Sequence, residues 1–302
     1  MFLDKVRNAL RVGGVSLLLG KVAYKCLSFV KDNIPAQQYA KYEFLFLNGY
    51  WPDFENPRSF NEKIAVRKIR QPHKLSTIVA DKWSVREYVQ DKGLSCILPH
   101  VLWCGDGVDE IPFETFPDKF VVKATHGSGW NIIVENKETI DVDQIKTQCK
   151  QWLAARYSSN LRETHYDEIK PRIIIEAYIL DDTYGVPLDF KFFCFNGKAH
   201  FVQVDAGRYV AHTRNVYNLS WEEMPFVFGF PRGEIIAKPE KLDKMIEISE
   251  QLSGDFDYCR IDLYCQNDAT LFFGEITLTP EAGLGRFSPR EWDFKMGELW
   301  QQ

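Results

Sequence analysis

The chain has 302 residues, of which 45% are hydrophobic and 14% aromatic, so it can bury a substantial core, and we expect two or more closely packed lobes. Its formal net charge of -5 at pH 7 provides no basic face for nucleic acid and argues against a polyanion as the main partner. Seven scattered cysteines without a CxxC pair argue against a zinc site and a disulfide framework, and they favour a reducing, cytoplasmic setting.

Residues 1–35 form a basic amphipathic segment whose apolar residues fall at helical spacing. Two acidic residues stand there against six basic ones, which are Lys5, Arg7, Arg11, Lys21, Lys25 and Lys31. Two interpretations stay open. We favour a helix packed on the body of the protein, because helical apolar stripes are usually core; the alternative is a helix that rests on an anionic membrane surface. No apolar run reaches the ~20 residues that span a bilayer, and no small-residue cleavage site follows VSLLLG, so we expect neither a membrane-spanning helix nor a signal peptide.

Residues 36–118 make a second region, in which we expect a helix over residues 80–93. Asp81 is a good N-cap for this helix and Gly93 a good C-cap. From residue 119 to 134, KFVVKATHGSGWNIIV predicts two short strands joined by a Gly-Ser-Gly loop. Lys123 ends the first strand beside this backbone-rich loop. A fixed positive charge next to such a loop suits phosphate, although a lysine in this position is more often plain surface.

Helices and strands alternate through the rest of the chain. We expect a helix over residues 141–157 with Asp143 as its cap, a buried strand over residues 171–180, and a further helix at about 240–252. The stretch LDFKFFCFNGKAHFVQVDAGRY contains Asn196-Gly197, a strong two-residue turn signal, and therefore predicts a hairpin.

The most informative stretch is YCRIDLYCQNDATLFFGEITLTP, which predicts two strands joined by a turn at Asp268-Ala269. Alternation places Arg260, Asp262 and Tyr264 on one face of the first strand and Phe273, Glu275 and Thr277 on one face of the second. Asp262 and Glu275 then lie opposite each other, with Cβ atoms ~5 Å apart. Two carboxylates this close repel each other unless a cation lies between them, so we infer a divalent metal. The alternative is a surface hairpin with solvated acids, but its apolar neighbours indicate strands buried on at least one side.

The common motifs GxxxxGK[ST], GxGxxG, HExxH and GxSxG are missing. However, NPRSFNEKI, ADKWSVREYV, VVKATHGSG, PLDFKFFCFNGK, RIDLY and GEITLTP follow one another in this order. From about residue 40 to 297 the chain thus resembles the TupA-like branch of the ATP-grasp superfamily, which is found with cell-surface polysaccharide genes. The resemblance implies an α+β ATP-grasp fold, in which two α+β lobes close on ATP, with a short N-terminal helical segment. The small lobe with the Gly-rich loop would span residues 119–180, and the large lobe with the metal site residues 181–302.

The resemblance also implies ATP and Mg²⁺ as cofactors and assigns roles to single residues. Lys82 and Lys123 would neutralise phosphates, and Asp262 and Glu275 would hold Mg²⁺ together with Thr277, which stands where most ATP-grasp enzymes carry an asparagine. Further cofactor contacts would come from Val121, Gly127, Ser128, Gly129, Glu176, Ile179 and Asp189. The residues expected to act on the transferred phosphoryl group are Lys191, Arg260 and Arg286. The candidates for the acceptor pocket are His126, Arg208, His212 and Arg214.

The implied activity is that of an ATP- and Mg²⁺-dependent carboxylate-amine ligase, which forms an amide through an acylphosphate. By resemblance the carboxylate belongs to a uronic acid of a surface polysaccharide or to a glutamyl chain, and the amine to an amino acid. Three alternatives stay open. They are a phosphotransferase on the same scaffold; a metal-dependent glycosyltransferase, motivated by Asp141-Val142-Asp143 and Asp255-Phe256-Asp257; and a nucleotide-gated adaptor anchored by its N-terminal helix. We expect the protein in the cytoplasm, or peripherally at the inner face of the cell membrane through residues 1–31.

Overall fold

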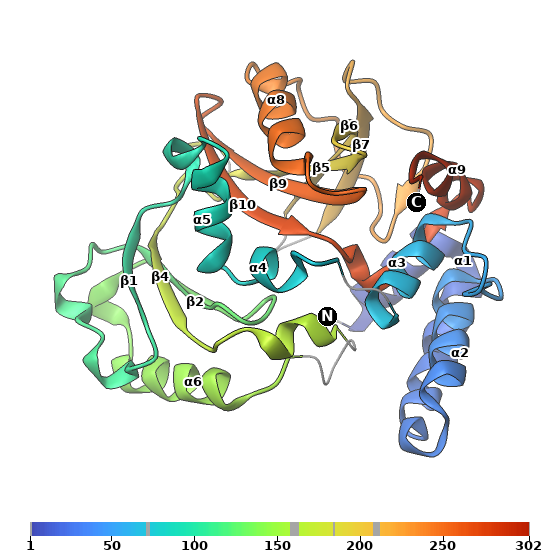
Figure 1. Ribbon diagram of the computed structural model, residues 1–302, viewed down its shortest axis with the longest axis horizontal. Coiled ribbons are helices and arrows are strands. Elements are labelled where there is room, and N and C mark those ends of the chain that lie inside the picture. The colour runs from blue at the N-terminus through green and yellow to red at the C-terminus, as the bar shows by residue number, and fades with distance from the viewer. Residues whose placement is uncertain (1, 71–72, 158–162, 184, 208–211, 302) are drawn as a thin grey trace.

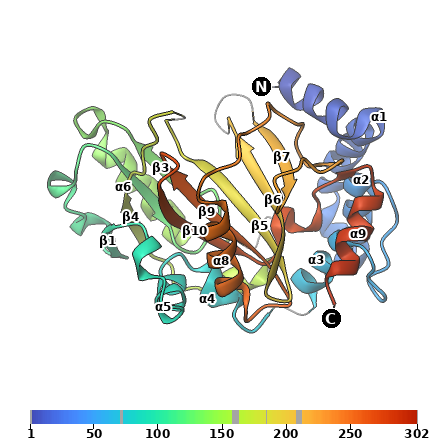
Figure 2. The ribbon, with the colours of Figure 1, turned by 90° about the horizontal axis from the view of Figure 1, so that it is seen from above.

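The computed structural model describes residues 2–70, 73–157, 163–183, 185–207 and 212–301. Figure 1 shows two α+β lobes, each built on an antiparallel sheet, and a group of helices from both ends of the chain. In the view of Figure 2 the first lobe and this helical group lie on opposite sides of the larger sheet. The mixed architecture with a helical N-terminal segment agrees with the predicted fold class.

The first lobe is built on a four-stranded sheet with the order β1-β4-β2-β3. Its elements are β1 (Val101–Gly105), β2 (Phe120–Ala124), β3 (Asn131–Val134), β4 (Ile173–Ala177) and α6 (Val142–Ala154). Side chains alternate along β2, so Phe120 and Val122 are buried with Ile173 in a core that includes α6. Val121 and Lys123 lie on the opposite face and line the cavities described below.

The second lobe is built on a five-stranded sheet with the order β10-β9-β5-β6-β7. The strands are β5 (Leu188–Phe195), β6 (Lys198–Ala206), β7 (Thr213–Asn218), β9 (Tyr258–Gln266) and β10 (Thr270–Thr277), and the helices α4 (Ser76–Ala80), α5 (Ser84–Asp91) and α8 (Leu242–Ser253) cover one face. On the other face Phe193 and Phe195 pack against the terminal helices and a two-stranded sheet of β8 (Val227–Phe228) and β11 (Phe287–Ser288). Because both faces are covered, all eight residues of β5 are buried.

The helical group contains α1 (Phe2–Ser28), α2 (Ala36–Asn48), α3 (Phe60–Ile69) and α9 (Glu291–Leu299). Helix α1 is kinked where Gly13 and Gly14 leave helical φ and ψ values, and it packs on α2 and β11. Its inner face buries Ala9, Val12 and Leu17. Within the described residues, no helix is both long enough and apolar enough to cross a membrane. The short 3₁₀ helices are η1 (Lys31–Asn33), η2 (Ser95–Ile97), η3 (Val108–Glu110), η4 (Phe113–Thr115), η5 (Lys137–Thr139), η6 (Thr164–Glu168) and η7 (Pro280–Gly283).

Most of the predicted elements are present, and two of the details differ. Asn196 and Gly197 both have positive φ and join β5 to β6, as the turn signal predicts. The predicted helix at 80–93 is instead α5 alone, preceded by a turn in which Asp81 accepts a hydrogen bond from Ser84 Oγ at 2.7 Å. The prediction that Asp143 caps α6 is wrong. Asp141 is the N-cap, because its extended backbone lets the carboxylate accept from Gln144 N at 2.9 Å.

Candidate functional site

Two adjoining cavities, of about 610 and 510 Å³, lie between the two sheets. Both are lined by β2 and β4 of the first lobe and by β5, β9 and β10 of the second. They share residues from each lobe, among them Lys123, Glu176, Asp189 and Phe273. The two cavities therefore form one continuous space that is bounded by both sheets.

The smaller cavity is largely apolar. Its walls include Val121 and Ile179, two of the cofactor contacts that the resemblance implies, together with Ile133, Ala177 and Leu188. An apolar slot flanked by a few polar groups is typical of a small-molecule site. The apolar walls of the smaller cavity suit a flat, weakly polar ring.

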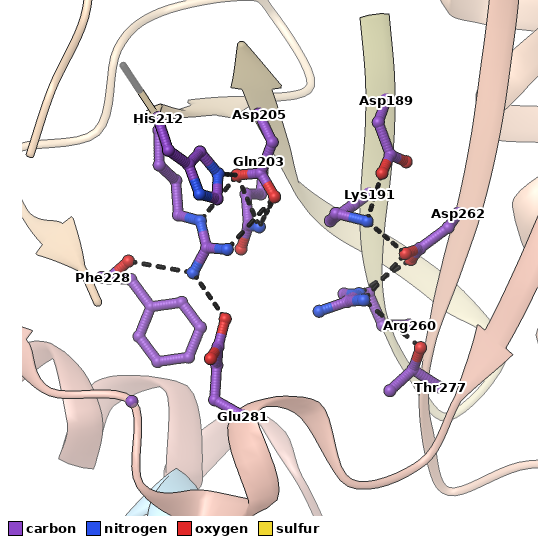
Figure 3. Close-up of polar contacts among 12 residues, drawn as sticks. Asp189, Lys191, Gln203, Asp205, His212, Phe228, Arg260, Asp262, Thr277 and Glu281 are labelled. Carbon is purple, nitrogen blue, oxygen red and sulfur yellow. Dashed lines mark hydrogen bonds and ion pairs between the residues drawn. The ribbon is translucent and has the colours of Figure 1, made fainter. Parts of the chain in front are cut away.

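The larger cavity is polar because the side chains on one face of the second sheet change from aromatic to charged along the strands. On the face of β5 that carries Phe193 and Phe195, the residues nearer the first lobe are Asp189 and Lys191. Lys191 donates to Asp189 at 2.6 Å and also to Asp262 of β9, its partner in the strand register (Figure 3). An aromatic core at one end of the face thus gives way to a buried charge network at the other.

Asp262 and Glu275 are paired across β9 and β10, as the sequence predicts, but a bulge between Phe273 and Glu275 produces this register. The bulge pairs Phe273 with Leu263 and breaks the predicted strict alternation from 273 to 277. Arg260 lies between the two acids. Its guanidinium donates twice to Asp262, at 2.7 Å each (Figure 3). It also donates once to Glu275, at 3.3 Å.

This arrangement corrects one step of the argument from sequence. We expected that two facing carboxylates would require a metal to offset their repulsion, whereas Arg260 and Lys191 already compensate them. Burial would raise the pKa of Glu275, but the charges of Lys191 and Arg260 and a hydrogen bond from Thr277 Oγ1 at 2.7 Å outweigh it and lower the pKa to about 2. Glu275 is therefore a carboxylate at neutral pH.

The donor set still fits a magnesium ion that is shared with phosphates. Such an ion needs only one or two protein carboxylates. Glu275 is suited to this role because its side chain is 47% exposed at the edge of the cavity, and Thr277 lies next to it. Asp262 has its oxygens engaged by Arg260 and Lys191. In the part of the chain that the structure describes, no group of three or more His, Cys, Asp or Glu residues could hold a metal by itself.

Glu176 has the same kind of surroundings as Asp262. One oxygen accepts from Lys123 Nζ at 2.6 Å, and the other accepts from Arg86 Nη1 at 3.1 Å. Arg86 is also bound to the carbonyl of Pro99 at 2.8 Å. The resemblance implies that Glu176 contacts the cofactor, and in the structure its carboxylate holds two cations. Each of the two buried acids, Glu176 and Asp262, is thus shared by one lysine and one arginine.

The Gly-Ser-Gly loop lies over the larger cavity. Ser128 and Gly129 line it, and Lys82 Nζ donates to the carbonyl oxygen of Gly127. Burial lowers the pKa of Lys82. His126, which we expected in the acceptor pocket, is instead buried beneath the loop, with Nε2 2.9 Å from the carbonyl oxygen of Trp152.

A second charge network, around Arg214 of β7, lies beside the first one (Figure 3). Arg214 donates to Asp205 at 2.6 Å through Nε and to Glu281 at 2.9 Å through Nη1. The ring of His212 lies 3.8 Å from that of Phe230. His212 and Arg214 thus reach the cavity, and the guanidinium of Arg214 holds two acids in place. Arg208 lies outside the described residues.

Arg286 does not reach either cavity. Its guanidinium donates to Ser16 Oγ at 2.8 Å and lies against α1, so the structure contradicts the expectation that it contacts a transferred phosphoryl group. The two acidic triplets are also outside the cavities. Asp141 caps α6, and Asp257 forms an ion pair with Arg67.

Sequence reasoning missed several charged cavity residues, among them Arg86, Glu163, Asp205 and Glu281. Glu163 is buried and accepts a hydrogen bond from Thr279 Oγ1, and burial raises the pKa of its carboxyl group. Tyr157 and Tyr166 line the cavity beside it, with ring centroids 4.6 Å apart. These residues stand between α6 and β4, where the sequence has no motif. Only the spacing of Arg86 on the helix after Lys82 offered a signal.

Comparisons with known proteins agree with this architecture. Residues 62–301 match the model of a protein family described as TupA-like ATPgrasp. Among solved structures, D-alanine–D-alanine ligase from Bacillus anthracis in complex with ATP is 14% identical, with 74% of this chain and 64% of that chain covered and a TM-score of 0.43. N5-carboxyaminoimidazole synthetase from Staphylococcus aureus is 12% identical, with 67% and 45% covered and a TM-score of 0.40. The chain spans less than two thirds of the length of either protein. No curated protein sequence matches it.

Proposed function

Because this chain belongs to the TupA-like ATP-grasp family, we propose that it is an ATP- and Mg²⁺-dependent carboxylate-amine ligase. In this reaction an oxygen of the substrate carboxylate attacks the γ-phosphorus of ATP, and ADP leaves. The nitrogen of an amine then attacks the acyl carbon of the resulting acylphosphate, so that an amide forms, inorganic phosphate leaves and the amine loses a proton. The chain has the α+β fold of the family.

The observation that carries the proposal is the continuous space between the lobes, which is apolar at one end and cationic in the middle. Lys82, Lys123, Lys191 and Arg260 line its polar part. Phosphoryl transfer needs positioning and charge neutralisation rather than a covalent nucleophile, and converging cations provide both.

Each part of the space corresponds to one part of the nucleotide. The apolar end with Val121 and Ile179 receives the base, and Asp189 lies where the two cavities join, within reach of the ribose. Lys82 and Lys123 neutralise the phosphates, while the backbone N–H groups of residues 127–129 bind them from the other side. Lys191 and Arg260 bind the transferred phosphoryl group.

Glu275 and Asp262 would hold Mg²⁺, with Thr277 beside them. A bound magnesium ion would neutralise charge on the phosphates and orient them. Glu275 is available for this because it is ionised and half-exposed. Asp262 becomes available when Lys191 turns toward a phosphate, because Arg260 still compensates part of its charge.

The acceptor substrates bind near His212 and Arg214. We propose that the carboxylate is that of a uronic acid in a cell-surface polysaccharide and that the amine belongs to an amino acid, in keeping with the gene context of the family. Arg208, which lies outside the described residues, stays a predicted member of the acceptor pocket.

The deciding experiment is mass analysis of the products formed from ATP, Mg²⁺, candidate uronic acids and a mixture of amino acids. A ligase gives ADP, phosphate and a product whose mass is the sum of the two substrates less one water. A phosphorylated acceptor without amide identifies a phosphotransferase instead. Consumption of a nucleotide sugar without ADP formation would identify a glycosyltransferase, and ATP binding with no ADP from any acceptor an adaptor; either result would refute the proposal.

We also propose that the protein works at the inner face of the cell membrane, through the outward face of α1. Val15, Leu19 and Val22 are exposed on this face, at 62%, 63% and 57%, and Phe29, directly after the helix, is 79% exposed. Lys21 and Lys25 are exposed on the same helix. Exposed apolar residues next to lysines are the composition that anionic bilayers attract. The inner face of α1 remains packed on α2, so contact with a membrane does not require the helix to detach.

A further inference from the structure

A third cavity, of about 330 Å³, lies at the kink of α1. It shares no lining residue with the two cavities of the candidate site. Its walls come from α1, from the C-terminal end of α2 and from residues 286–290. Three of the lining side chains are those of Arg11, Arg286 and Arg290, and none of the lining residues that the structure describes is acidic.

Arg286 is held firmly at the centre of this cavity. Its Nη2 donates to Ser16 Oγ at 2.8 Å, and the backbone of two glycines approaches the guanidinium. A Cβ atom at Gly13 would lie 3.0 Å from Nε, and one at Gly49 would lie 3.1 Å from Nη2. Gly49 also has a φ of +83°, which ends α2 in the left-handed conformation. A Cβ atom at either position would press on the guanidinium, so the backbone of both glycines packs closely against Arg286.

Another nitrogen of this guanidinium, Nη1, lacks a partner among the described residues. Nη1 of Arg286 is buried and has no hydrogen-bond acceptor within the described parts of the chain. Burial and the neighbouring charge of Arg290 both lower the pKa of Arg286. A buried donor of a charged group without an acceptor is unfavourable, and it indicates a partner that the protein itself does not provide.

The two acids that follow the cavity in the sequence are already in use. Glu291 and Asp293 stand in the first turn of α9, directly after the cavity. Glu291 accepts from Lys295 at 2.9 Å, and Asp293 accepts from Tyr50 at 2.7 Å. Arg290 packs over the ring of Tyr50, 5.4 Å from its centroid, and this contact keeps its charge near the cavity without neutralising it.

We propose that this cavity binds an oxyanion of the phosphate class, with Nη1 of Arg286 as the central donor and Arg11 and Arg290 at the rim. A guanidinium is the side chain best matched to phosphate oxygens. The three arginines carry three positive charges, one more than is needed to neutralise the two negative charges of a phosphate monoester. The phosphate has two plausible sources of the same chemistry, a soluble phosphate compound and the headgroup of a lipid. The exposed Val15 and Leu19 follow the kink directly, on the same helix. This site is independent of the nucleotide site and of the reaction proposed there.

The test is thermal unfolding of the full chain in increasing inorganic phosphate, against chloride at equal ionic strength. A ligand that binds only the folded state raises the unfolding temperature. We expect phosphate to do so for the wild type, and we expect Arg286→Gln and Arg290→Gln each to raise the Kd for phosphate about tenfold or more, the usual effect of losing a charge-assisted hydrogen bond. The matched control is Lys25→Gln, which removes the same charge from exposed α1 outside the cavity and should behave as the wild type.

Two outcomes would overturn the proposal. One is a wild-type protein that does not respond to phosphate. The other is a response that persists in both arginine variants, which would place the anion among the lysines of the central space. Should Arg286→Gln fail to fold, Arg290→Gln still decides, because Arg290 is exposed and its loss leaves no buried gap.

Vesicles distinguish the two sources once the site is established. Sedimentation is compared for phosphatidylcholine vesicles with and without phosphatidic acid, whose headgroup is a phosphomonoester. If the headgroup occupies the site, Arg290→Gln loses several-fold more binding to the acidic vesicles than Lys25→Gln does. If the two variants lose binding equally, the cavity serves a soluble phosphate compound.

Discussion

Glu275 and Asp262 face each other across one hairpin but differ in exposure, at 47% and 2% of the side chain. Glu275 is therefore the acid that can meet a metal without rearrangement, and we predict that Glu275→Gln leaves the fold intact and lowers ligase turnover about a hundredfold or more. Calorimetric titration of ATP with Mg²⁺ and with EDTA provides a measurement that needs no acceptor. The difference between the two affinities should shrink in the variant.

The control for this prediction is Glu247→Gln, which removes an exposed acid from α8 far from the cavities. It should retain the wild-type response to Mg²⁺. Unchanged Mg²⁺ dependence in Glu275→Gln would show that this side chain is not a ligand.

His165 provides a prediction about pH. Burial lowers its pKa to about 4, so the folded protein resists a proton that the unfolded chain takes up near pH 6.5. The resulting stability is complete above the unfolded pKa and is lost as the pH falls from about 6.5 toward 4. Between about pH 7.5 and 5, this one group should remove about 2 kcal/mol from the free energy of unfolding. Denaturant titrations should find this loss in the wild type to be larger than in His165→Asn by that amount, and equal losses would refute it.

At the scale of elements, α3 has a complete capping box. Ser59 Oγ accepts from Glu62 N at 3.1 Å, and Glu62 Oε2 accepts from Ser59 N at 2.9 Å, both within buried surroundings. We predict that Ser59→Ala lowers the free energy of unfolding by about 1–2 kcal/mol. Asp141→Ala removes the exposed single-bond cap of α6 and should cost less than Ser59→Ala. Denaturant midpoints measure both, and the reverse order would contradict the argument.

Local signals in the sequence predicted the elements well where each signal acts within a few residues. The Asn196-Gly197 turn follows from turn chemistry. The pairing of Asp262 with Glu275 was predicted as well, but it depends on a bulge that alternation does not contain. The bulge that shifts Phe273 was not foreseen, because alternation by itself assumes one residue on each strand at every step. The cap of α6 was misplaced for a related reason: two aspartates stand within one turn, and only backbone geometry selects between them.

Contacts between distant segments set the limit of the sequence-based prediction. Arg86 meets Glu176 across 90 positions of the chain, and no local pattern predicts such a pair. The same limit explains Arg286. Arg286 was expected near a phosphoryl group because it is an arginine in a segment that resembles ATP-grasp proteins. In the fold it instead contacts Ser16, which stands 270 positions earlier in the sequence.

For the molecule as a whole, the interpretation of α1 as a packed helix holds for its inner face, and contact with a membrane through its outer face stays a prediction. The inner face buries Ala9, Val12 and Leu17, and the outer face leaves Leu19 and Val22 in solvent. Removing the whole segment would therefore expose core. We predict that Leu19→Ser together with Val22→Ser reduces co-sedimentation with phosphatidylglycerol vesicles several-fold at unchanged thermal stability, because apolar area at the bilayer is lost.

A suitable control exchanges two apolar residues that are exposed elsewhere, Ile235 and Trp83, for serine. These variants should sediment as the wild type does. Equal loss in both pairs would mean that the protein adsorbs without using α1.

The sharing of each buried acid by one lysine and one arginine has a consequence for how the central space fills. When a polyphosphate binds, Lys123 and Lys191 can turn from their carboxylates to its phosphate oxygens. Arg86 and Arg260 then remain paired with those carboxylates. Neither carboxylate is left without a cation in this exchange. A buried charge without a partner is what makes breaking an interior ion pair so unfavourable. In each group of one acid, one lysine and one arginine, the lysine is thus the cation that can change partner and the arginine the cation that stays bound.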